Sequence, residues 1–376
     1  MLTRRSLLPL LALLFCSSPA TAAESRVYFG TYTKEGESQG IYHATFDDST
    51  GKFGELALAA EMKNPSFLAV APSGKTLYAV SEVAGANGEG EVSAFRILES
   101  GSLELINTVR AGGGGPCHVS LSPDGKTLAV ANYGGGSVAS YRVANDGALS
   151  EPVTVIQHAG SSVHPTRQKG PHAHSINFSL DGRFAYAADL GTDRIYRYAV
   201  DAATGALTAS GETVIAPASG PRHFAFRPDG AFAYLINEMT LMMTAFRVDK
   251  ASGELTELQS LSTLPPGTEK IGSTAEVVAH PTGRFVYGSN RGHDSIVAYA
   301  IDEASGELSY LANEPIRGKV PRNFAVSPSG KWLLAAGQQS RSVTVFAIDE
   351  ATGKLTFADS EIAVWSPVCI RFVPVK

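Results

Sequence analysis

Short segments rich in hydrophobic residues alternate along this chain with clusters of turn-forming residues. In the clearest stretch, residues 115–143, the breaks are Ser-Pro-Asp-Gly at 122–125 and Tyr-Gly-Gly-Gly at 133–136. Proline presets φ at the second position of such a turn, and glycine closes it. The segments between and after the breaks predict β-strands at residues 117–121, 127–132, 138–143 and 149–156. Four such strands form one antiparallel sheet, which cannot bury both of its faces alone.

The same arrangement recurs along the chain at intervals of roughly 50 residues. The turn before each fourth strand ends in a glycine, and seven copies are present: Gly51, Gly101, Gly147, Gly205, Gly253, Gly306 and Gly353. First strands also number seven if residues 367–373 are included, and residues 26–31 and 40–46 then supply their partners. We therefore predict an all-β, seven-bladed β-propeller with four antiparallel strands per blade. Pairing of the N- and C-terminal strands in one blade would close the ring and remove the free edge.

Composition narrows the classes of partner. The chain has 376 residues with 38 glycines and 20 prolines, and the repeat spans nearly all of it, so we predict one domain over residues 24–376. Its net charge of −5 and its lack of basic runs argue against nucleic acid or an anionic membrane as a partner. Cys117 and Cys369 lie on first strands of non-adjacent blades, so no disulfide is expected.

The first 23 residues predict a signal peptide. Arg4 and Arg5 precede an apolar run at 7–15 that is too short to span a bilayer, and Ala-Thr-Ala at 20–22 is a typical cleavage site. The two arginines are compatible with either a twin-arginine signal or the positive end of an ordinary secretory leader. Cys16 follows a bulky phenylalanine, which disfavours a lipoprotein anchor. We therefore predict an exported, periplasmic protein that is soluble after cleavage.

The two rims of the predicted ring differ. Turns between strands 1 and 2, and between strands 3 and 4, are short and uniform, and they emerge on one rim. Loops on the other rim vary in length and composition, at residues 33–39, 83–90, 112–115, 157–170, 265–273 and 292–294. Variable loops on a uniform scaffold usually carry function, so the variable rim and its channel mouth are the candidate site.

Alignment of the repeats brings polar residues to this channel mouth. His174, Arg222 and Arg322 start innermost strands, Glu82, Glu238 and Arg291 follow second strands, His118 and His223 come one place further along the innermost strands, and Asn132 and Asn290 lie just beneath. A scaffold alone would carry mostly small or apolar residues here. The excess of positive charge suits a carboxylate, a phosphate or a developing oxyanion. The alternative is a water-filled channel with polar walls, in which Glu238 merely neutralises Arg222.

Two further groups of residues are less specific. His172 and His174 share a strand face and could bind a metal, but no third ligand supports such a site. The long loop at 157–170 carries His158, His164, Arg167 and Lys169, which are compatible with either a basic lid or ordinary surface.

Four motifs resemble those of the seven-bladed propeller lactonase family, which includes bacterial 6-phosphogluconolactonases of propeller type and the fungal carboxy-cis,cis-muconate cyclase. They are Gly-Pro-His-Ala-His-Ser at 170–175, Gly-Pro-Arg-His at 220–223, Asn-Glu at 237–238 and Ser-Asn-Arg-Gly-His-Asp at 289–294. The likeness extends over the chain from about Val27. It implies that His174, Arg222, Glu238 and Arg291 occupy active-site positions. The predicted signal peptide departs from this family pattern, because an exported enzyme would seldom meet a phosphate ester that is made in the cytosol. Export therefore argues against a phosphorylated substrate but not against lactone hydrolysis.

These observations predict a lactonase that hydrolyses a sugar δ-lactone, most plausibly of the 6-phosphogluconolactone type. The expected catalytic residues are His174 for proton transfer, Glu238 as general base or as the group that orients His174, and Arg222 and Arg291 for the oxyanion or an acid group. The expected substrate-binding residues are Arg322, His223, Asn290, Asn132 and His118. No metal or cofactor is expected, because the arginines supply positive charge, and a monomer is favoured. The alternatives are a muconate-type lactonising cyclase and a non-enzymatic binding propeller, which would present exposed aromatic or apolar patches on the variable rim.

Overall fold

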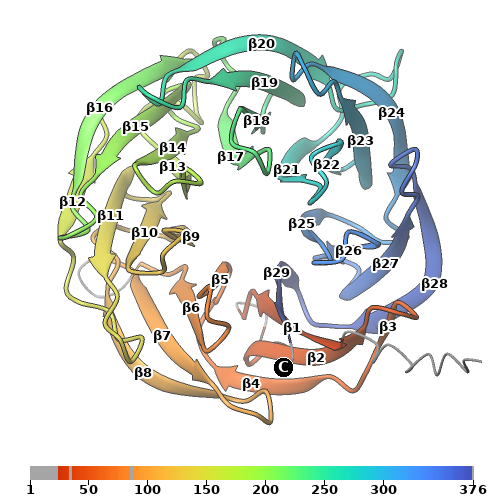
Figure 1. Ribbon diagram of the computed structural model, residues 1–376, viewed down its shortest axis with the longest axis horizontal. Coiled ribbons are helices and arrows are strands. Elements are labelled where there is room, and N and C mark those ends of the chain that lie inside the picture. The colour runs from red at the N-terminus through yellow and green to blue at the C-terminus, as the bar shows by residue number, and fades with distance from the viewer. Residues whose placement is uncertain (1–23, 34–35, 85–87, 375–376) are drawn as a thin grey trace, which may run out of the picture.

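A computed structural model describes residues 24–33, 36–84 and 88–374. The predicted signal peptide lies outside these residues. Seven antiparallel sheets, six of four strands and one of five, are arranged in a ring around a central axis, as predicted, and each is one blade (Figure 1). Along the described part of the chain, no helix has the length and hydropathy needed to cross a bilayer.

Six blades follow one another along the chain, each beginning with its innermost strand. The first three are β5 (Leu68–Val70), β6 (Thr76–Ser81), β7 (Glu91–Ile97) and β8 (Leu103–Arg110); β9 (Pro116–Leu121), β10 (Thr127–Asn132), β11 (Ser137–Arg142) and β12 (Thr154–Gln157); and β13 (Ala173–Phe178), β14 (Phe184–Asp189), β15 (Arg194–Val200) and β16 (Leu207–Val214). The next three are β17 (Pro221–Phe226), β18 (Phe232–Asn237), β19 (Met242–Val248) and β20 (Leu255–Ser262); β21 (Ser273–Ala279), β22 (Phe285–Arg291), β23 (Ser295–Ile301) and β24 (Leu308–Pro315); and β25 (Pro321–Val326), β26 (Trp332–Gly337), β27 (Ser342–Ile348) and β28 (Leu355–Ala363).

The seventh blade is built from both ends of the chain. Its innermost strand is β29 (Pro367–Pro374), followed outward by β1 (Glu24–Thr31), β2 (Gly40–Asp47), and the short β3 (Lys52–Phe53) and β4 (Ala57–Glu61). β29 pairs antiparallel with β1, placing Phe29 opposite Ile370, and both side chains are fully buried. The closure predicted from the repeat count is confirmed, so the ring has no open edge between its first and last strands (Figure 1).

The predicted fourth strand at 149–156 is wrong in its first half. Leu149 forms only an isolated bridge to Val143, and strand pairing resumes at Thr154. Pro152 lies between these points and has no backbone N–H to donate to the neighbouring strand, so the ladder is interrupted there.

Tyrosines of second strands join neighbouring blades. Each is buried between two sheets, and its hydroxyl donates to the carbonyl of the repeated turn glycine of the next blade. The pairs are Tyr28 to Gly101, Tyr78 to Gly147, Tyr186 to Gly253, Tyr234 to Gly306 and Tyr287 to Gly353. Because the ring buries these hydroxyls, the hydrogen bonds satisfy them while the rings fill the space between blades.

Candidate functional site

Three of the predicted site residues lie at β-bulges on the innermost strands. In β13, Ala173 pairs with Asp189 and Ser175 with Ala188, so His174 is the extra residue between two pairs. Arg222 in β17 and Arg322 in β25 are the extra residues of equivalent shifts. A bulge breaks strict alternation and re-aims a side chain. It therefore lets consecutive residues of one strand serve the same channel.

Glu238 lies at the centre of a cluster of charged side chains drawn from three consecutive blades and one loop. Its Oε2 accepts a hydrogen bond from Arg222 Nε at 2.9 Å and lies 3.0 Å from Arg291 Nη2. Its Oε1 accepts from Arg167 Nη2 at 2.8 Å. His174 Nε2 lies 3.8 Å from Glu238 Oε2. The structure thus brings together the four residues expected to be catalytic and adds Arg167.

The charges in this cluster depend on one another. Burial by itself would raise the pKa of the Glu238 carboxyl, but Arg291, Arg222 and Arg167 outweigh it and lower that pKa to about 2. Burial, with Arg222 nearby, lowers the pKa of Arg291 to about 10, which leaves it protonated at neutral pH. Glu238 is therefore a carboxylate held by three guanidinium groups.

His174 is neutral at pH 7 in this environment. Burial, followed by the positive charges of Arg222 and Arg322, holds the pKa of its imidazole well below the ordinary value. Its Nδ1 lies 3.7 Å from the Sγ of Cys117, which donates to the His174 carbonyl at 3.3 Å. A neutral imidazole beside a carboxylate can accept a proton and is stabilised by that carboxylate once charged.

A second pair of charged groups completes the mouth. Tyr32 donates to Glu82 Oε2 at 2.8 Å, and the Arg322 guanidinium lies 5.4 Å from the centre of the Tyr32 ring. In the described ranges, no carboxylate forms an ion pair with Arg322. Arg322 faces the same cavity as His174 and Arg222. It is thus a cation available to an anionic ligand.

His118 and His223 lie deeper in the channel. Their rings are 5.3 Å apart, and the His223 ring is 5.4 Å from that of His174. His223 Nδ1 lies 2.7 Å from Glu276 Oε1, while Asn323 hydrogen bonds to the other oxygen of Glu276. This layer is buried and supports the mouth from below.

The Nδ2 groups of Asn132 and Asn290, two residues expected to bind substrate, donate hydrogen bonds within the scaffold, while Asn132 Oδ1 is buried without a hydrogen-bond partner. Asn132 Nδ2 donates to Ala111 O and to the Ser137 hydroxyl, and Asn290 Nδ2 donates to Thr263 O. Both side chains are completely buried. Their hydrogen bonds tie blades to the loops beside them, and the structure does not bring them to the carboxylate cluster.

Arg167 is a site residue that the sequence named only as part of a possible basic lid, with ordinary surface as the alternative. It comes from the 157–170 loop, and its Nη2 also donates to Tyr133 O–H at 3.0 Å. Tyr133 stacks on His172, with ring centres 4.5 Å apart, and His172 Nδ1 bonds to the Tyr133 carbonyl. In the described ranges, no group of three or more His, Cys, Asp or Glu residues is arranged to hold a metal ion. The length and basic residues of the loop were the available signals for Arg167.

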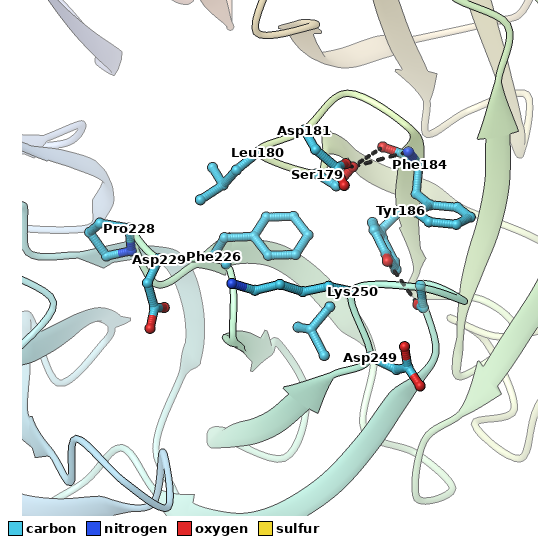
Figure 2. Close-up of a pocket in the computed structure, with 13 residues that line it drawn as sticks. Ser179, Leu180, Asp181, Phe184, Tyr186, Phe226, Pro228, Asp229, Asp249 and Lys250 are labelled. Atoms are coloured by element: carbon cyan, nitrogen blue, oxygen red, sulfur yellow. Dashed lines mark hydrogen bonds between the residues drawn. The ribbon is translucent and has the colours of Figure 1, made fainter.

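The cavity at the mouth is small, and the larger pockets lie elsewhere. The cavity of about 10 Å³ at the mouth is lined by Tyr32, Glu82, Cys117, His174, Arg222, His223 and Arg322, whereas Glu238, Arg291 and Arg167 lie outside its lining. A pocket of about 270 Å³ opens on the opposite rim, where Figure 2 shows Phe226, Tyr186 and Lys250 facing it. Its acidic residues bind groups in their own turns, as Asp181 does with Ser179. The mouth, with its neutral histidine and paired carboxylate, has the chemistry of a reaction site.

The fold and this site define a class of protein: a closed β-propeller whose channel mouth holds a buried carboxylate among arginines beside a neutral histidine. Residues 26–372 match the family described as lactonase, 7-bladed beta-propeller, and the chain belongs to that family. It is 35% identical over 347 residues to the 6-phosphogluconolactonase of Bacillus subtilis, covering 92% of this chain and 97% of the relative. It is also 34% identical over 308 residues to the 6-phosphogluconolactonase of Formosa agariphila, covering 80% of this chain and 86% of the relative.

A solved structure shows the same architecture. The periplasmic gluconolactonase of Pseudomonas aeruginosa superposes with a TM-score of 0.87 at 36% sequence identity, covering 94% of this chain and all of that one (100%). The predicted fold, family and lactonase class are confirmed by these matches.

Proposed function

We propose that this protein hydrolyses the ring ester of a sugar δ-lactone, giving the open aldonic acid, with 6-phospho-glucono-1,5-lactone as the first candidate substrate. One observation carries the proposal: at the mouth of a closed propeller, a histidine whose pKa is lowered by burial lies 3.8 Å from a carboxylate that is held by three arginines. This supplies a proton acceptor and fixed positive charge at one place, which are the two requirements of ester hydrolysis without a covalent intermediate.

His174 is the proposed proton carrier. It takes a proton from a water molecule as the water oxygen bonds to the lactone carbonyl carbon. The negative charge that develops on the carbonyl oxygen is stabilised by Arg222 and Arg291. The ring C–O bond then breaks, and the protonated His174 returns its proton to the leaving ring oxygen. The products are one carboxylic acid and one hydroxyl, and His174 is neutral again because it has given up the proton that it took from water.

Glu238 is better suited to orient and stabilise than to act as the base. Both of its oxygens are already engaged by arginines, which also lower its pKa to about 2, whereas His174 forms no ion pair with an arginine. At 3.8 Å from His174 Nε2, its charge favours the imidazolium formed during the reaction. Of the two roles predicted for Glu238, we therefore favour the orienting one.

The charges at the mouth support an anionic substrate. Arg167, Arg222, Arg291 and Arg322 face Glu82 and Glu238, and His174 is neutral, so positive charge is in excess. A phosphate monoester would balance this excess, whereas an unphosphorylated lactone would not. The names of the two relatives agree with a phosphorylated substrate, and that of the Pseudomonas structure agrees with an unphosphorylated one.

We also propose that the protein acts in the periplasm. The leader-like residues 1–23 and the periplasmic neighbour from Pseudomonas support this location. A periplasmic enzyme would meet lactones made by oxidation of sugars outside the cytoplasm, so both the phosphorylated and the plain lactone belong in any assay.

A binding propeller is the weaker alternative. Val163, Ile271 and Trp365 are exposed on the variable rim, with 64%, 51% and 40% of their surfaces accessible. Val163 lies between β12 and β13, Ile271 between β20 and β21, and Trp365 between β28 and β29. These connections are spread around the ring, so the three side chains do not form one patch.

The proposal is tested by following acid release from glucono-δ-lactone, its 6-phosphate and a muconate-derived lactone, against the spontaneous rate. Wild type should accelerate hydrolysis of a sugar lactone, and His174→Ala should lower kcat by at least a hundredfold. His293→Ala, a histidine on the same rim that bonds to Ser295, is the matched control and should keep a rate within twofold. Equal rates for wild type and His174→Ala would remove the catalytic assignment.

A further inference from the structure

We propose that Arg167 determines substrate specificity: on binding, its guanidinium leaves Glu238 and pairs with the anionic group of the lactone, a phosphate monoester remote from the ring ester. The inference rests on the proposed lactonase function and adds to it a residue and an exchange of partners. The ligand is defined by its charge, and the unphosphorylated sugar lactone is the comparison.

Arg167 is the outermost of the guanidinium groups on Glu238. Its side chain is 42% exposed, whereas those of Arg222 and Arg291 are 3% and 15% exposed. It alone bonds to Oε1 of Glu238, while the other two arginines pair with Oε2. When Arg167 leaves, Glu238 therefore keeps two of its three cationic partners. The exchange costs little because the carboxylate stays paired and the arginine gains another anion.

The loop that carries Arg167 is fixed to the scaffold. At its start, His158 is completely enclosed between Asp189, at 2.6 Å, and the Tyr198 hydroxyl, at 2.7 Å. In its middle, the Ser162 hydroxyl donates to Asp193 at 2.6 Å. Next to Arg167, the fully buried Gln168 donates to the Leu190 carbonyl at 2.9 Å. Buried polar groups with satisfied hydrogen bonds hold a loop in one conformation. The backbone therefore presents Arg167 to the mouth, and only its side chain has freedom to move.

The enclosed cavity next to the cluster is too small for the substrate. It holds about 10 Å³, room for about one water molecule, and its lining includes His174 and Arg222 but neither Glu238 nor Arg167. A sugar lactone would therefore approach from the side on which Arg167 is exposed to solvent. Arg167 is the most exposed of the groups paired with Glu238, and it is the one on a connection outside the blades. Its departure exposes Glu238 Oε1 on the solvent side. Arg322, which has no carboxylate partner among the described residues, lines the adjoining cavity together with His174 and Arg222.

The experiment compares two substrates in four proteins. The quantity is the preference, defined as kcat/KM for 6-phospho-glucono-1,5-lactone divided by kcat/KM for glucono-1,5-lactone. We expect Arg167→Ala to lower this preference at least tenfold, mainly through KM for the phosphorylated lactone, because the other substrate offers Arg167 no anion. Arg167→Lys keeps the charge but loses the planar guanidinium, so its preference should lie between those of wild type and Arg167→Ala. Lys169→Ala removes the same charge from the exposed part of the same loop and should keep the wild-type preference within twofold.

Each outcome decides the inference. An unchanged preference in Arg167→Ala, an equal loss in Lys169→Ala, or a wild type that hydrolyses only the plain lactone would overturn it. A wild type that hydrolyses neither sugar lactone would refute the proposed function. Calorimetric binding of 6-phosphogluconate and gluconate then decides the role of Arg167 without turnover. A tenfold weaker affinity of Arg167→Ala for the phosphorylated acid alone supports the role, and equal affinities, or no binding by wild type, refute it.

Discussion

Replacing Glu238 by glutamine tests the electrostatic core of the site. The change keeps the size and shape of the side chain and removes one negative charge. Arg222 and Arg291, with side chains only 3% and 15% exposed, then remain charged within about hydrogen-bonding distance of a neutral amide. An unpaired buried charge is far more costly than a well-formed pair is favourable. The variant should therefore lose stability as well as activity.

The expected loss can be estimated from the structure. Removing one partner of a buried ion pair lowers the free energy of unfolding by about 3–5 kcal/mol. Unfolding entropy is about 2.1 cal/mol/K per residue, or about 0.7 kcal/mol/K for a chain of roughly 350 residues, so the expected fall in Tm is about 4–7 °C. Glu82→Gln is the matched control, because Glu82 accepts from the neutral Tyr32 hydroxyl. It should lower Tm by less than about 2 °C, because no arginine in the described ranges forms an ion pair with Glu82 and a glutamine oxygen can still accept from Tyr32, so the loss should not exceed about 1.5 kcal/mol.

The assay is thermal unfolding followed by circular dichroism between pH 3 and pH 8. The Glu238 carboxyl has a pKa of about 2 in the folded protein and an ordinary value of 4.5. Its stabilising contribution is therefore complete above pH 4.5 and declines as the pH falls toward 2, so the difference between wild type and Glu238→Gln should narrow in acid. Inorganic phosphate should raise Tm more in the variant, whose arginines lack their carboxylate. Equal Tm values at pH 7, or a difference that stays constant down to pH 3, would show that Glu238 does not neutralise the arginines.

Three further predictions concern the histidine, the loop and the ring. Because the pKa of His174 is held well below its ordinary value, kcat/KM should stay level as pH falls through 6.5, and Arg322→Met, which removes one cause of that depression, should move the acid limb of the pH–rate profile to higher pH. A Cβ at Gly191 would lie 1.9 Å from the Gly170 carbonyl at the end of the Arg167 loop. Gly191→Ala should therefore lower Tm by about 1–4 °C, from about 1–3 kcal/mol of strain, whereas Gly170→Ala, with open space around it, should leave Tm unchanged. Ending the chain before residue 367 removes the innermost strand that pairs with β1, and a purified chain of this length should show no cooperative melting transition.

The sequence alone determined the architecture, because a propeller is a repeat. Each copy carries its own turn chemistry, and counting the turn glycines gives the number of blades. The aligned repeats also located His174, Arg222, Glu238 and Arg291 at one rim, since equivalent positions in equivalent blades face the same channel. The repeat can be recognised from short stretches of sequence, and closure of the ring places residues at equivalent repeat positions close together in space.

Only the tertiary structure decided which polar residues meet. Asn132 and Asn290 occupy the same repeat position as the residue before Glu238, yet their Nδ2 groups donate to backbone carbonyls of neighbouring loops. Arg167 lies outside the repeat, so no alignment of blades could place it on Glu238. The protonation states also depend on packing: the low pKa of Glu238 requires three arginines from separate segments at once. Contacts between non-repeating loops and the channel depend on how the ring closes in space, and a repeating pattern carries no information about them.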